Sequence, residues 1–545
     1  MEQLRSRVRG GATLAERLLL AVGQRAEPLL KALGNLASLD FIRNAEPLEL
    51  ARLVLAHLGP ATLVMLRDVL EAEGLKPPGR WNTAQARAFV ASLGFPEEFA
   101  LAAEARREPE ELVSGPIPLP PLHDFQQEVL DNVKDLLAPG SGRRRAVISL
   151  PTGAGKTRVT VEAAVQFVLR PNGSRRRVLW IAQTDELCEQ AVQAFRQVWI
   201  NLGAQDTNLR VVRLWGGNPD PTSGDPNQPV VVVATIQTLT NRLWAAKLTS
   251  LEKPGLVVLD ECHHAIAPSY TKVLRWFHAD SPKPDEAEEQ EPPILGLSAT
   301  PFRTTEEESR LLARRFDHRL FPSDQKGLHE RLLARGILAR VTTEPLESGF
   351  APPEDLLETL FLLSEKGEGV EFERQLEMLN ELLARDQDRN NMLIERIKMA
   401  EETSVLFFAN SVLHAEEISA RLNLAGIPSA PISAETPMTA RRYFLDQFKQ
   451  GELRVLCNYT LLSTGFDAPK TEMIVIARQV FSPVRYMQMV GRGLRGPKNG
   501  GMESCRIVTV LDNLGQFQDR HPYHYCQKYF GNTENNVARS IANPR

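Results

Sequence analysis

The sequence has few cysteines, almost no net charge and no long hydrophobic run. Its five cysteines form no CxxC pair, which argues against a disulfide framework and is typical of free thiols in a reducing compartment. A net charge of -4 excludes a polycation that coats nucleic acid, so any nucleic-acid surface must be a local basic strip.

No uninterrupted apolar stretch approaches the roughly 20 residues that span a bilayer. Glu16 and Arg17 interrupt the apolar run near the N-terminus, which argues against a signal peptide. We expect a cytoplasmic protein that does not enter membranes.

The length and the residue pattern predict several domains. A chain of 545 residues suggests about three or four of them. Residues 1–112 are rich in Leu and Ala at helical spacing and predict an all-helical N-terminal accessory domain. The proline-rich segment 115–121 predicts a stiff linker. We expect a first α/β domain over 113–308, a helical, charged connector over 309–400, and a second α/β domain with a short C-terminal tail over 401–545.

Short apolar runs predict the strands of two parallel sheets. They are often rich in Val and Ile and alternate with longer helical stretches, a pattern typical of buried parallel strands that helices cover on both faces. The predicted fold class is therefore α/β, with two doubly wound units. The runs are 146–150, 178–182, 230–234, 256–259 and 294–297 in the first unit, and 404–408, 453–457, 473–477 and 506–511 in the second.

The segment 150–157, LPTGAGKT, lies between a predicted strand and a predicted helix. Gly153 and Gly155 allow the backbone to turn tightly and to present its N–H groups, and the helix N-terminus behind them favours anionic oxygens. Lys156 would reach the β- and γ-phosphates of a nucleotide, and Thr157 would offer a hydroxyl to Mg²⁺. A leucine stands where the common phosphate-loop pattern has its first Gly. The strand–loop–helix context nevertheless makes this a strong signal for phosphate binding.

A carboxylate pair follows the predicted strand 256–259. In the segment 259–264, LDECHH, two carboxylates, a thiol and two imidazoles could each bind a metal, so zinc, magnesium and a strand end without chemistry are the alternatives. A phosphate loop needs a carboxylate at the end of a neighbouring strand to hold Mg²⁺. Asp260 would hold the ion through water, and Glu261 would orient or deprotonate the attacking water. Because Mg²⁺ takes oxygen ligands and keeps most of its waters, Cys262 and the histidines need not bind it.

Seven segments, in order, resemble the motifs of the superfamily-2 helicases and translocases over about residues 120–515. They are 122–126 (LHDFQ), 150–157, 260–264 (DECHH, similar to a DExH box with Cys in place of Ala), 296–301 (GLSATP), 405–411 (VLFFANS), 460–469 (TLLSTGFDAP) and 486–496 (YMQMVGRGLRG). The sixth segment departs from the family at Thr464, where Glu or Arg is commoner. The resemblance implies two RecA-like doubly wound parallel-sheet domains that bind ATP and Mg²⁺ between them.

The resemblance also implies roles at the nucleotide. Gln126 would read the adenine base, and Gln488 would sense the γ-phosphate or the water. Phosphoryl transfer places negative charge on the equatorial oxygens, and Arg492 and Arg495, which share one face if helical, would stabilise that charge. The predicted catalytic residues are Lys156, Asp260, Glu261, Gln488, Arg492 and Arg495. The predicted ATP-binding residues are Gln126, Thr152, Gly153, Ala154, Gly155, Lys156, Thr157, Gly465 and Asp467, of which Thr157, together with Asp260, would hold Mg²⁺.

Polar residues at strand ends are the candidates for nucleic-acid contacts. Small hydroxyls, amides and backbone N–H groups suit binding to phosphates without reading the base sequence. The family pattern implies contacts from Gln183, Thr184, Thr235, Gln237, Thr238, Asn410, Ser411 and Thr460. It also implies that His263, Ser298 and Thr300 couple the ATP site to the nucleic acid.

Three functions follow from these patterns. The first is an ATP-dependent DNA helicase or translocase, because the box with two histidines and the SATP and QMVGR segments look closest to DNA-repair and restriction-type motors, RadD-like proteins among them. Such motors serve DNA repair, restriction or antiphage defence. The second is an RNA helicase, which is less favoured because the box is not DEAD and the last segment lacks the HRIGR form. The third is an ATP-switched subunit of a larger complex that binds a protein partner through residues 1–112.

Overall fold

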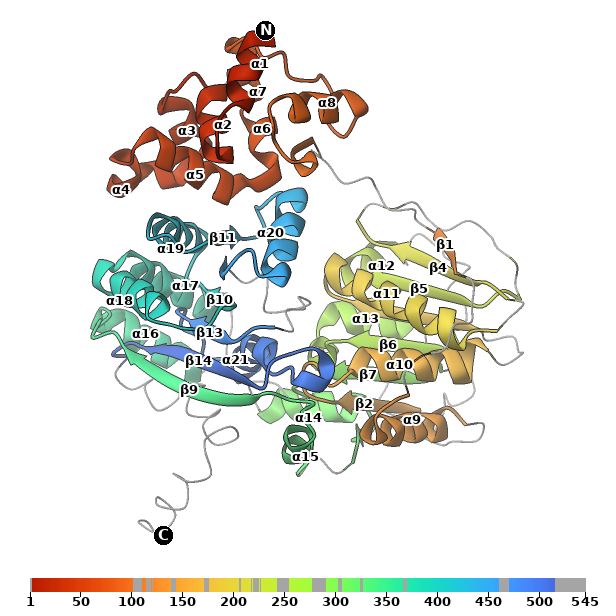
Figure 1. Ribbon diagram of the computed structural model, residues 1–545. Helices are drawn as coiled ribbons and strands as arrows, with labels where there is room; N and C mark the ends of the chain where they lie inside the picture. Colours follow the sequence, from red (N-terminus) through yellow and green to blue (C-terminus); the bar gives the residue numbers. More distant parts are fainter. Residues whose placement is uncertain are drawn as a thin grey trace.

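The computed structural model (Figure 1) describes most of the chain. Thr460, Gly465 and Asp467, which were predicted to contact nucleic acid or ATP, lie outside the described residues, as does most of the predicted linker 115–121. The described residues are 2–100, 110–113, 119, 121–138, 144–170, 176–204, 207–216, 218, 225, 227–242, 254–276, 291–301, 306–323, 327–365, 370–459 and 470–514.

Residues 2–100 form a group of helices around their own apolar core, as predicted. Helix starts follow local capping: Thr13 accepts a hydrogen bond from the N–H of Glu16, and Thr83 accepts one from Ala86. The stretch Pro47–Met65 is long and apolar enough to span a membrane, but 56% of it is buried in this core, so it is weak evidence for a span. The helices are α1 (Glu2–Arg9), α2 (Leu14–Ala21), α3 (Glu27–Ala32), α4 (Asp40–Arg43), α5 (Pro47–Leu58), α6 (Thr62–Met65), α7 (Arg67–Ala72) and α8 (Ala84–Ser92).

The first sheet has the strand order β1-β4-β5-β3-β6-β7-β2-β8, and only β1 runs antiparallel to its neighbour. Its central strands are buried along their whole length, since helices cover both faces. The strands are β1 (Glu110–Val113), β2 (Arg145–Ser149), β3 (Arg177–Ala182), β4 (Leu209–Leu214), β5 (Val230–Thr235), β6 (Leu256–Asp260), β7 (Ile294–Ser298) and β8 (Leu320–Phe321). The helices are α9 (Asp124–Leu137), α10 (Lys156–Ala164), α11 (Asp185–Leu202), α12 (Ile236–Arg242), α13 (Pro268–Trp276), α14 (Glu306–Arg315) and α15 (Leu328–Ala334).

The second sheet is parallel throughout, in the order β11-β12-β10-β13-β14-β9. Its strands are β9 (Arg340–Glu347), β10 (Val405–Phe408), β11 (Ser429–Ile432), β12 (Val455–Asn458), β13 (Met473–Ile476) and β14 (Ser504–Leu511). Its helices are α16 (Glu354–Glu365), α17 (Val370–Arg385), α18 (Gln387–Lys398), α19 (Val412–Leu424), α20 (Met438–Gln450) and α21 (Pro483–Val490). The predicted fold class, two RecA-like doubly wound parallel-sheet domains after a helical N-terminal region, is confirmed.

The apolar runs predicted β2, β3, β5, β6, β7, β10, β12, β13 and β14 but missed the other strands. In β4 the buried Arg210 and Arg213 interrupt the apolar run. β11 contains Pro431, which a strand at the edge of a sheet tolerates. β8 and β9 lie within 309–400, which was predicted as a helical connector. The structure corrects this prediction, because the stretch adds one strand to each sheet.

Among the described residues, the N-terminal helices pack on the second sheet domain. In Figure 1 they lie beside α19, β11 and α20, and α5 contacts both α19 and β11. Ala420 of α19 is 4% exposed and belongs to the N-terminal apolar core, and the rings of Phe99 and Tyr443 meet edge to face at 6.4 Å. A Cβ at Gly59 would lie 3.0 Å from the ring of Phe444. The N-terminal region and the second domain therefore share an apolar interface.

We predict that Ala420→Arg separates the N-terminal helices from the second domain, because the charged side chain would enter an apolar contact without a partner. Small-angle scattering should show a larger radius of gyration while circular dichroism keeps its helix signal. The matched control is Met399→Arg, which places the same charge at a position of the same domain that is 77% exposed. An unchanged scattering curve for Ala420→Arg would contradict the interface.

Candidate ATP site between the two sheet domains

The strand ends of the first sheet bring three predicted segments together. β7 lies between β2 and β6, with Ser149 opposite Ser298 and Asp260 opposite Leu297. Because these strands are parallel, the phosphate loop, the carboxylate pair and the segment 296–301 leave the same edge of the sheet side by side.

The phosphate loop depends on two glycines. Gly153 and Gly155 have φ angles of 83° and 85°, in the left-handed region that favours glycine. At Gly155 a Cβ would also collide with Nε2 of Gln126. The backbone turn and the close approach of a neighbouring helix therefore both require glycine in this loop.

The donors of the phosphate loop bind its own carbonyl groups in this structure. Lys156 Nζ donates to the carbonyl of Leu150 at 2.9 Å, and the N–H of Ala154 donates to the carbonyl of Pro151 at 3.1 Å. Burial lowers the pKa of Lys156, while the nearby Glu261 and Asp260 act to raise it. Incoming phosphates would thus exchange internal hydrogen bonds for charge-assisted ones.

Gln126, predicted to read adenine, has a side chain that joins α9 to the phosphate loop. Its amide nitrogen donates to the carbonyl of Ala154 at 3.0 Å, and its amide oxygen accepts from the N–H of His123 at 3.0 Å. The side chain is buried. These contacts hold the first turn of α9 against the loop, and the adenine contact stays a prediction.

The two carboxylates after β6 lie in different electrostatic environments. Burial, with the neighbouring Glu261, raises the pKa of Asp260 to about 7, although Lys156 opposes the shift. Burial also acts to raise the pKa of Glu261, but His263, Lys156 and Arg492 outweigh it and lower that pKa to about 2. Glu261 has φ 48° and ψ 54°, a left-handed conformation that is strained for a residue with a side chain. At neutral pH Glu261 is a fixed carboxylate that can accept a hydrogen bond from water.

The donor set of the site fits Mg²⁺ better than zinc. Thr157 and Asp260 both line the cleft and offer oxygen, which Mg²⁺ prefers. Among the residues that the structure describes, no group of three or more His, Cys, Asp and Glu side chains is arranged to hold a metal. Cys262 is fully buried, and a Cβ at Gly296 would lie 2.7 Å from its sulfur. The thiol therefore fills the space beside β7.

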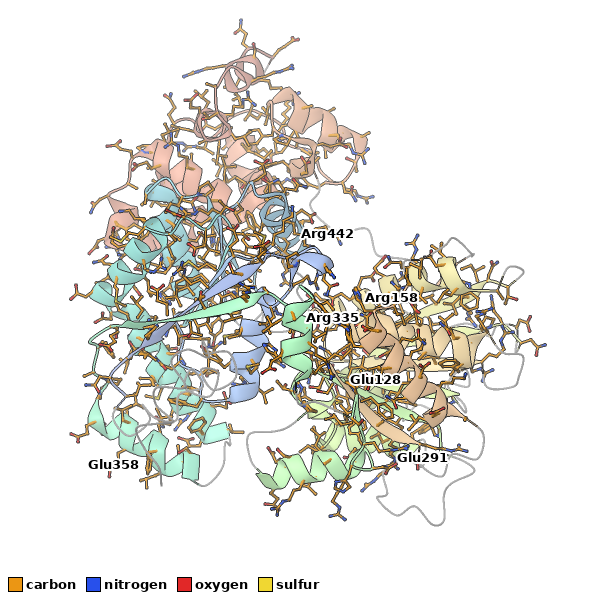
Figure 2. The ribbon with its side chains drawn as sticks, turned by 60° about the horizontal axis from the view of Figure 1, so that its bottom comes forward. Glu128, Arg158, Glu291, Arg335, Glu358 and Arg442 are labelled. Atoms are coloured by element: carbon orange, nitrogen blue, oxygen red, sulfur yellow. The ribbon has the colours of Figure 1, made fainter. Side chains whose placement is uncertain are left out.

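The second domain completes the site with residues of α21 and of the segment that follows it. Gln488, Arg492 and Arg495 line one cleft of about 1050 Å³ together with the phosphate loop and the carboxylate pair. A Cβ at Gly153 would lie 3.4 Å from Nε of Arg495, and one at Gly491 would lie 2.7 Å from Oγ1 of Thr152. Arg495 therefore lies directly against the phosphate loop, and Arg492 lines the same cleft. Figure 2 shows the positions of Arg158 and Arg442, which line the same cleft from α10 and α20.

The predicted coupling residues lie close to this cleft. His263 Nδ1 is 3.3 Å from an oxygen of Glu261, and its Nε2 is 3.5 Å from Nε2 of Gln488 on the second domain. The N–H of Thr300 donates to Oγ of Ser298 at 3.0 Å, and the buried hydroxyl of Thr300 has no hydrogen-bond partner among the described residues. His263 thus connects the carboxylate pair with the second domain, while its link to Ser298 and Thr300 stays a prediction.

The predicted nucleic-acid residues of the first domain lie at strand ends. Thr184 caps α11 by accepting a hydrogen bond from the N–H of Leu187, and the hydroxyl of Thr235 donates to that of Thr238 at 2.9 Å. Gln183 is half-buried and Gln237 is exposed. Their contacts with nucleic acid stay predictions.

In the second domain the predicted contact residues have local structural roles. Ser411 caps α19 through the N–H of His414. Asn410 is 2% exposed and lies between Asn380 and Arg389, with hydrogen bonds of 3.1 Å and 3.2 Å. The backbone N–H of Asn410 also donates, to Nδ1 of His414 at 3.1 Å. A phosphate contact from Asn410 would require this buried network to open, and the contact stays a prediction.

Two contacts between the domains were missed by the sequence analysis. Asn499 Nδ2 donates to the carbonyl of Gly153 at 2.9 Å. Arg441 of α20 forms an ion pair with Glu186 of α11 at 2.9 Å and also donates to the carbonyl of Ser433. No local pattern marks these residues, because each contact depends on how the two domains meet.

Two doubly wound sheet domains that share one cleft, with a phosphate loop and carboxylates on one side and paired arginines on the other, define a two-domain phosphate-loop nucleotide-binding protein. Residues 120–303 match the family "Type III restriction enzyme, res subunit", and residues 388–496 match "Helicase conserved C-terminal domain". Together these matches cover more than half of the chain. The chain belongs to the superfamily-2 helicases.

Several known proteins are similar to most of this chain. A Saccharomyces cerevisiae protein named as an ATP-dependent helicase, IRC3, is 27% identical over 401 residues, which is 72% of this chain and 52% of the relative. The endonuclease subunit of the type I restriction enzyme EcoKI from Escherichia coli K12 is 23% identical over 442 residues, 72% of this chain and 34% of the relative. A solved fragment assigned to the HsdR subunit of a Vibrio vulnificus type I restriction enzyme has a TM-score of 0.49 at 20% identity, covering 76% of this chain and 68% of that chain. The chain spans between about half and two thirds of the first curated relatives.

We predict that Glu261→Gln lowers ATP turnover by at least about 10²-fold, because the amide cannot take a proton from the attacking water. Nucleotide affinity should stay close to that of the unchanged protein, since the variant keeps the shape of the site. Steady-state hydrolysis and equilibrium nucleotide binding measure the two effects separately. Full hydrolysis in the variant would remove Glu261 from its proposed role.

We predict that Arg495→Ala lowers kcat on the order of 10³-fold and changes nucleotide affinity much less, because an arginine supplied by a second domain mainly stabilises the charge of the transition state. The control is Lys498→Ala, which removes an exposed positive charge three residues further on. Equal losses of binding and hydrolysis in Arg495→Ala would contradict this role.

Proposed function

We propose that the chain is a cytoplasmic ATP-dependent DNA helicase or translocase that hydrolyses ATP between its two sheet domains. One observation carries the proposal. Lys156 and Asp260 from the first domain and Arg492 from the second line a single cleft. Catalytic groups divided in this way make hydrolysis depend on how the domains are positioned, which is what a nucleic-acid motor requires.

The residues of the cleft would divide the work on ATP. Lys156 would leave the carbonyl of Leu150 to bind the phosphates, and Thr157 with Asp260 would hold Mg²⁺. The ion, when bound, supplies positive charge that offsets the charge of the phosphates. Glu261 would orient and deprotonate the attacking water, and Arg492 with Arg495 would stabilise the transferred phosphoryl group.

DNA is the favoured substrate. One relative is named as part of a restriction endonuclease, a class of enzyme that acts on DNA, and another is named as an ATP-dependent helicase. Small polar groups at the strand ends of β3 and β5 suit contact with a phosphate backbone. A place in DNA repair, restriction or antiphage defence is part of this proposal.

A second candidate role concerns the N-terminal helices. They pack on α19 and α20, and α20 carries Arg441, whose ion pair reaches Glu186 on the first domain. A protein partner bound to residues 2–100 could therefore act on the relative position of the two sheet domains. This observation favours an ATP-switched subunit as the alternative to a motor that works alone.

We predict that DNA stimulates ATP hydrolysis at least about tenfold more than RNA of matched sequence. Hydrolysis and strand displacement should be measured with single-stranded, duplex and forked DNA and with the corresponding RNA. Lys156→Ala is the control for contaminating ATPase, because the missing ammonium group leaves the phosphates without their main cation. Stimulation by RNA alone would contradict the DNA assignment, and a lack of stimulation by any nucleic acid would contradict the motor.

A further inference from the structure

The loop after the paired arginines is held firmly by the segment that joins the two sheet domains. The N–H groups of Gly496 and Lys498 donate to the carbonyls of Ile337 and Gly336 at 2.9 Å and 3.0 Å, and the N–H of Ala339 donates to the carbonyl of Leu494 at 2.9 Å. Residues 494–499 and 336–339 therefore form one unit.

The joining segment is also attached to the first domain. Arg335, at its start, forms an ion pair with Asp124 at the first turn of α9. Figure 2 labels Arg335, at the end of α15, between the two sheet domains and close to α9, which carries the labelled Glu128. The unit formed by 494–499 and 336–339 thus lies where the two sheet domains meet.

One side chain of this unit binds the phosphate loop. Asn499 Nδ2 lies 2.9 Å from the carbonyl oxygen of Gly153 and 3.5 Å from that of Ile337. Both oxygens accept, so the amide nitrogen uses its two hydrogens to bridge the phosphate loop and the joining segment. Asn499 is half-buried.

The orientation of the Gly153 carbonyl matters for binding an anion. A phosphate loop binds through N–H groups, and a carbonyl that turned inward would oppose the charge of the phosphates. Gly153 can rotate more freely than other residues, since its φ of 83° is in the region open to glycine. Gln126 fixes the next carbonyl, that of Ala154, from within the first domain. The carbonyl of Gly153 is held by the second domain.

We propose that Asn499 is a positioning residue for the phosphate loop. It keeps the Gly153 carbonyl turned away from the phosphates only while the second domain is docked. Nucleotide affinity then depends on the contact between the domains, in addition to the transition-state role of Arg492 and Arg495. This inference rests on the proposed function in one respect, namely that the ligand of the loop is ATP or ADP.

The test measures equilibrium binding of ADP and ATP hydrolysis in the full chain. Asn499→Ala should weaken ADP binding about fivefold, the effect of one lost hydrogen bond, with kcat at saturating ATP changed less than about threefold. Asn499→Asp should weaken binding more, about tenfold or beyond, because a carboxylate would face two carbonyl oxygens. Asn499→Gln keeps the donor and should recover binding to within about twofold. Lys498→Ala, which removes the neighbouring exposed side chain, should bind ADP as the unchanged protein does.

The other possible results either overturn the positioning role of Asn499 or separate it from the proposed motor function. Unchanged ADP affinity in Asn499→Ala overturns the proposal. Weak binding that Asn499→Gln does not recover, accompanied by a lower melting temperature, shows a purely structural role and also overturns it. If Asn499→Ala weakens ADP binding but nucleic acid never stimulates hydrolysis, the motor function fails and the positioning role stands. A chain that binds no nucleotide contradicts both.

Discussion

The close approach of the second domain to the phosphate loop is the contact on which the rest of this structure depends. Thr152 occupies the space that a Cβ at Gly491 would need, and Arg495 packs at van der Waals distance from the position of a Cβ at Gly153. This fit places two arginines beside Lys156 and the carboxylate pair, in a site where burial strengthens electrostatic interactions. A larger residue at Gly491 would push the domains apart and separate the arginines of the second domain from Lys156 and the carboxylate pair of the first.

The same contact explains why the buried charges are tolerated. Glu261 is held as a carboxylate by His263, Lys156 and Arg492, and the last of these comes from the second domain. His263 and Lys156 of the first domain have the larger effects on the pKa of Glu261, and Arg492 of the second domain adds to them. On the far side of the second domain, the N-terminal helices pack on α20, whose Arg441 bonds to Glu186 across the cleft. The N-terminal region, the second domain and the ATP site thus form one continuous set of contacts.

The sequence predicted the parts of this structure that depend on local patterns. Buried strands such as β5, with four consecutive valines, and the glycine turn of the phosphate loop follow from residue type and spacing. β9 could not be found in this way, because as an edge strand it alternates between exposed and half-buried residues. Asn499 and the pair formed by Glu186 and Arg441 could not be found either. Their partners lie hundreds of residues away in the sequence, and only the docking of the domains brings them together.

The central claim is that ATP is bound between two domains that change their relative position when they hold it. The described cysteines are all buried and free, so spin labels can be directed to Trp276→Cys on α13 and Met399→Cys beside α18, with Cys526 replaced by Ser. Pulsed electron spin resonance would then measure the distance between the domains without ligand, with ADP, and with a non-hydrolysable ATP analogue plus single-stranded DNA. Our account predicts a distinct distance distribution in the presence of the ATP analogue and DNA. Identical distributions in all three states would contradict it.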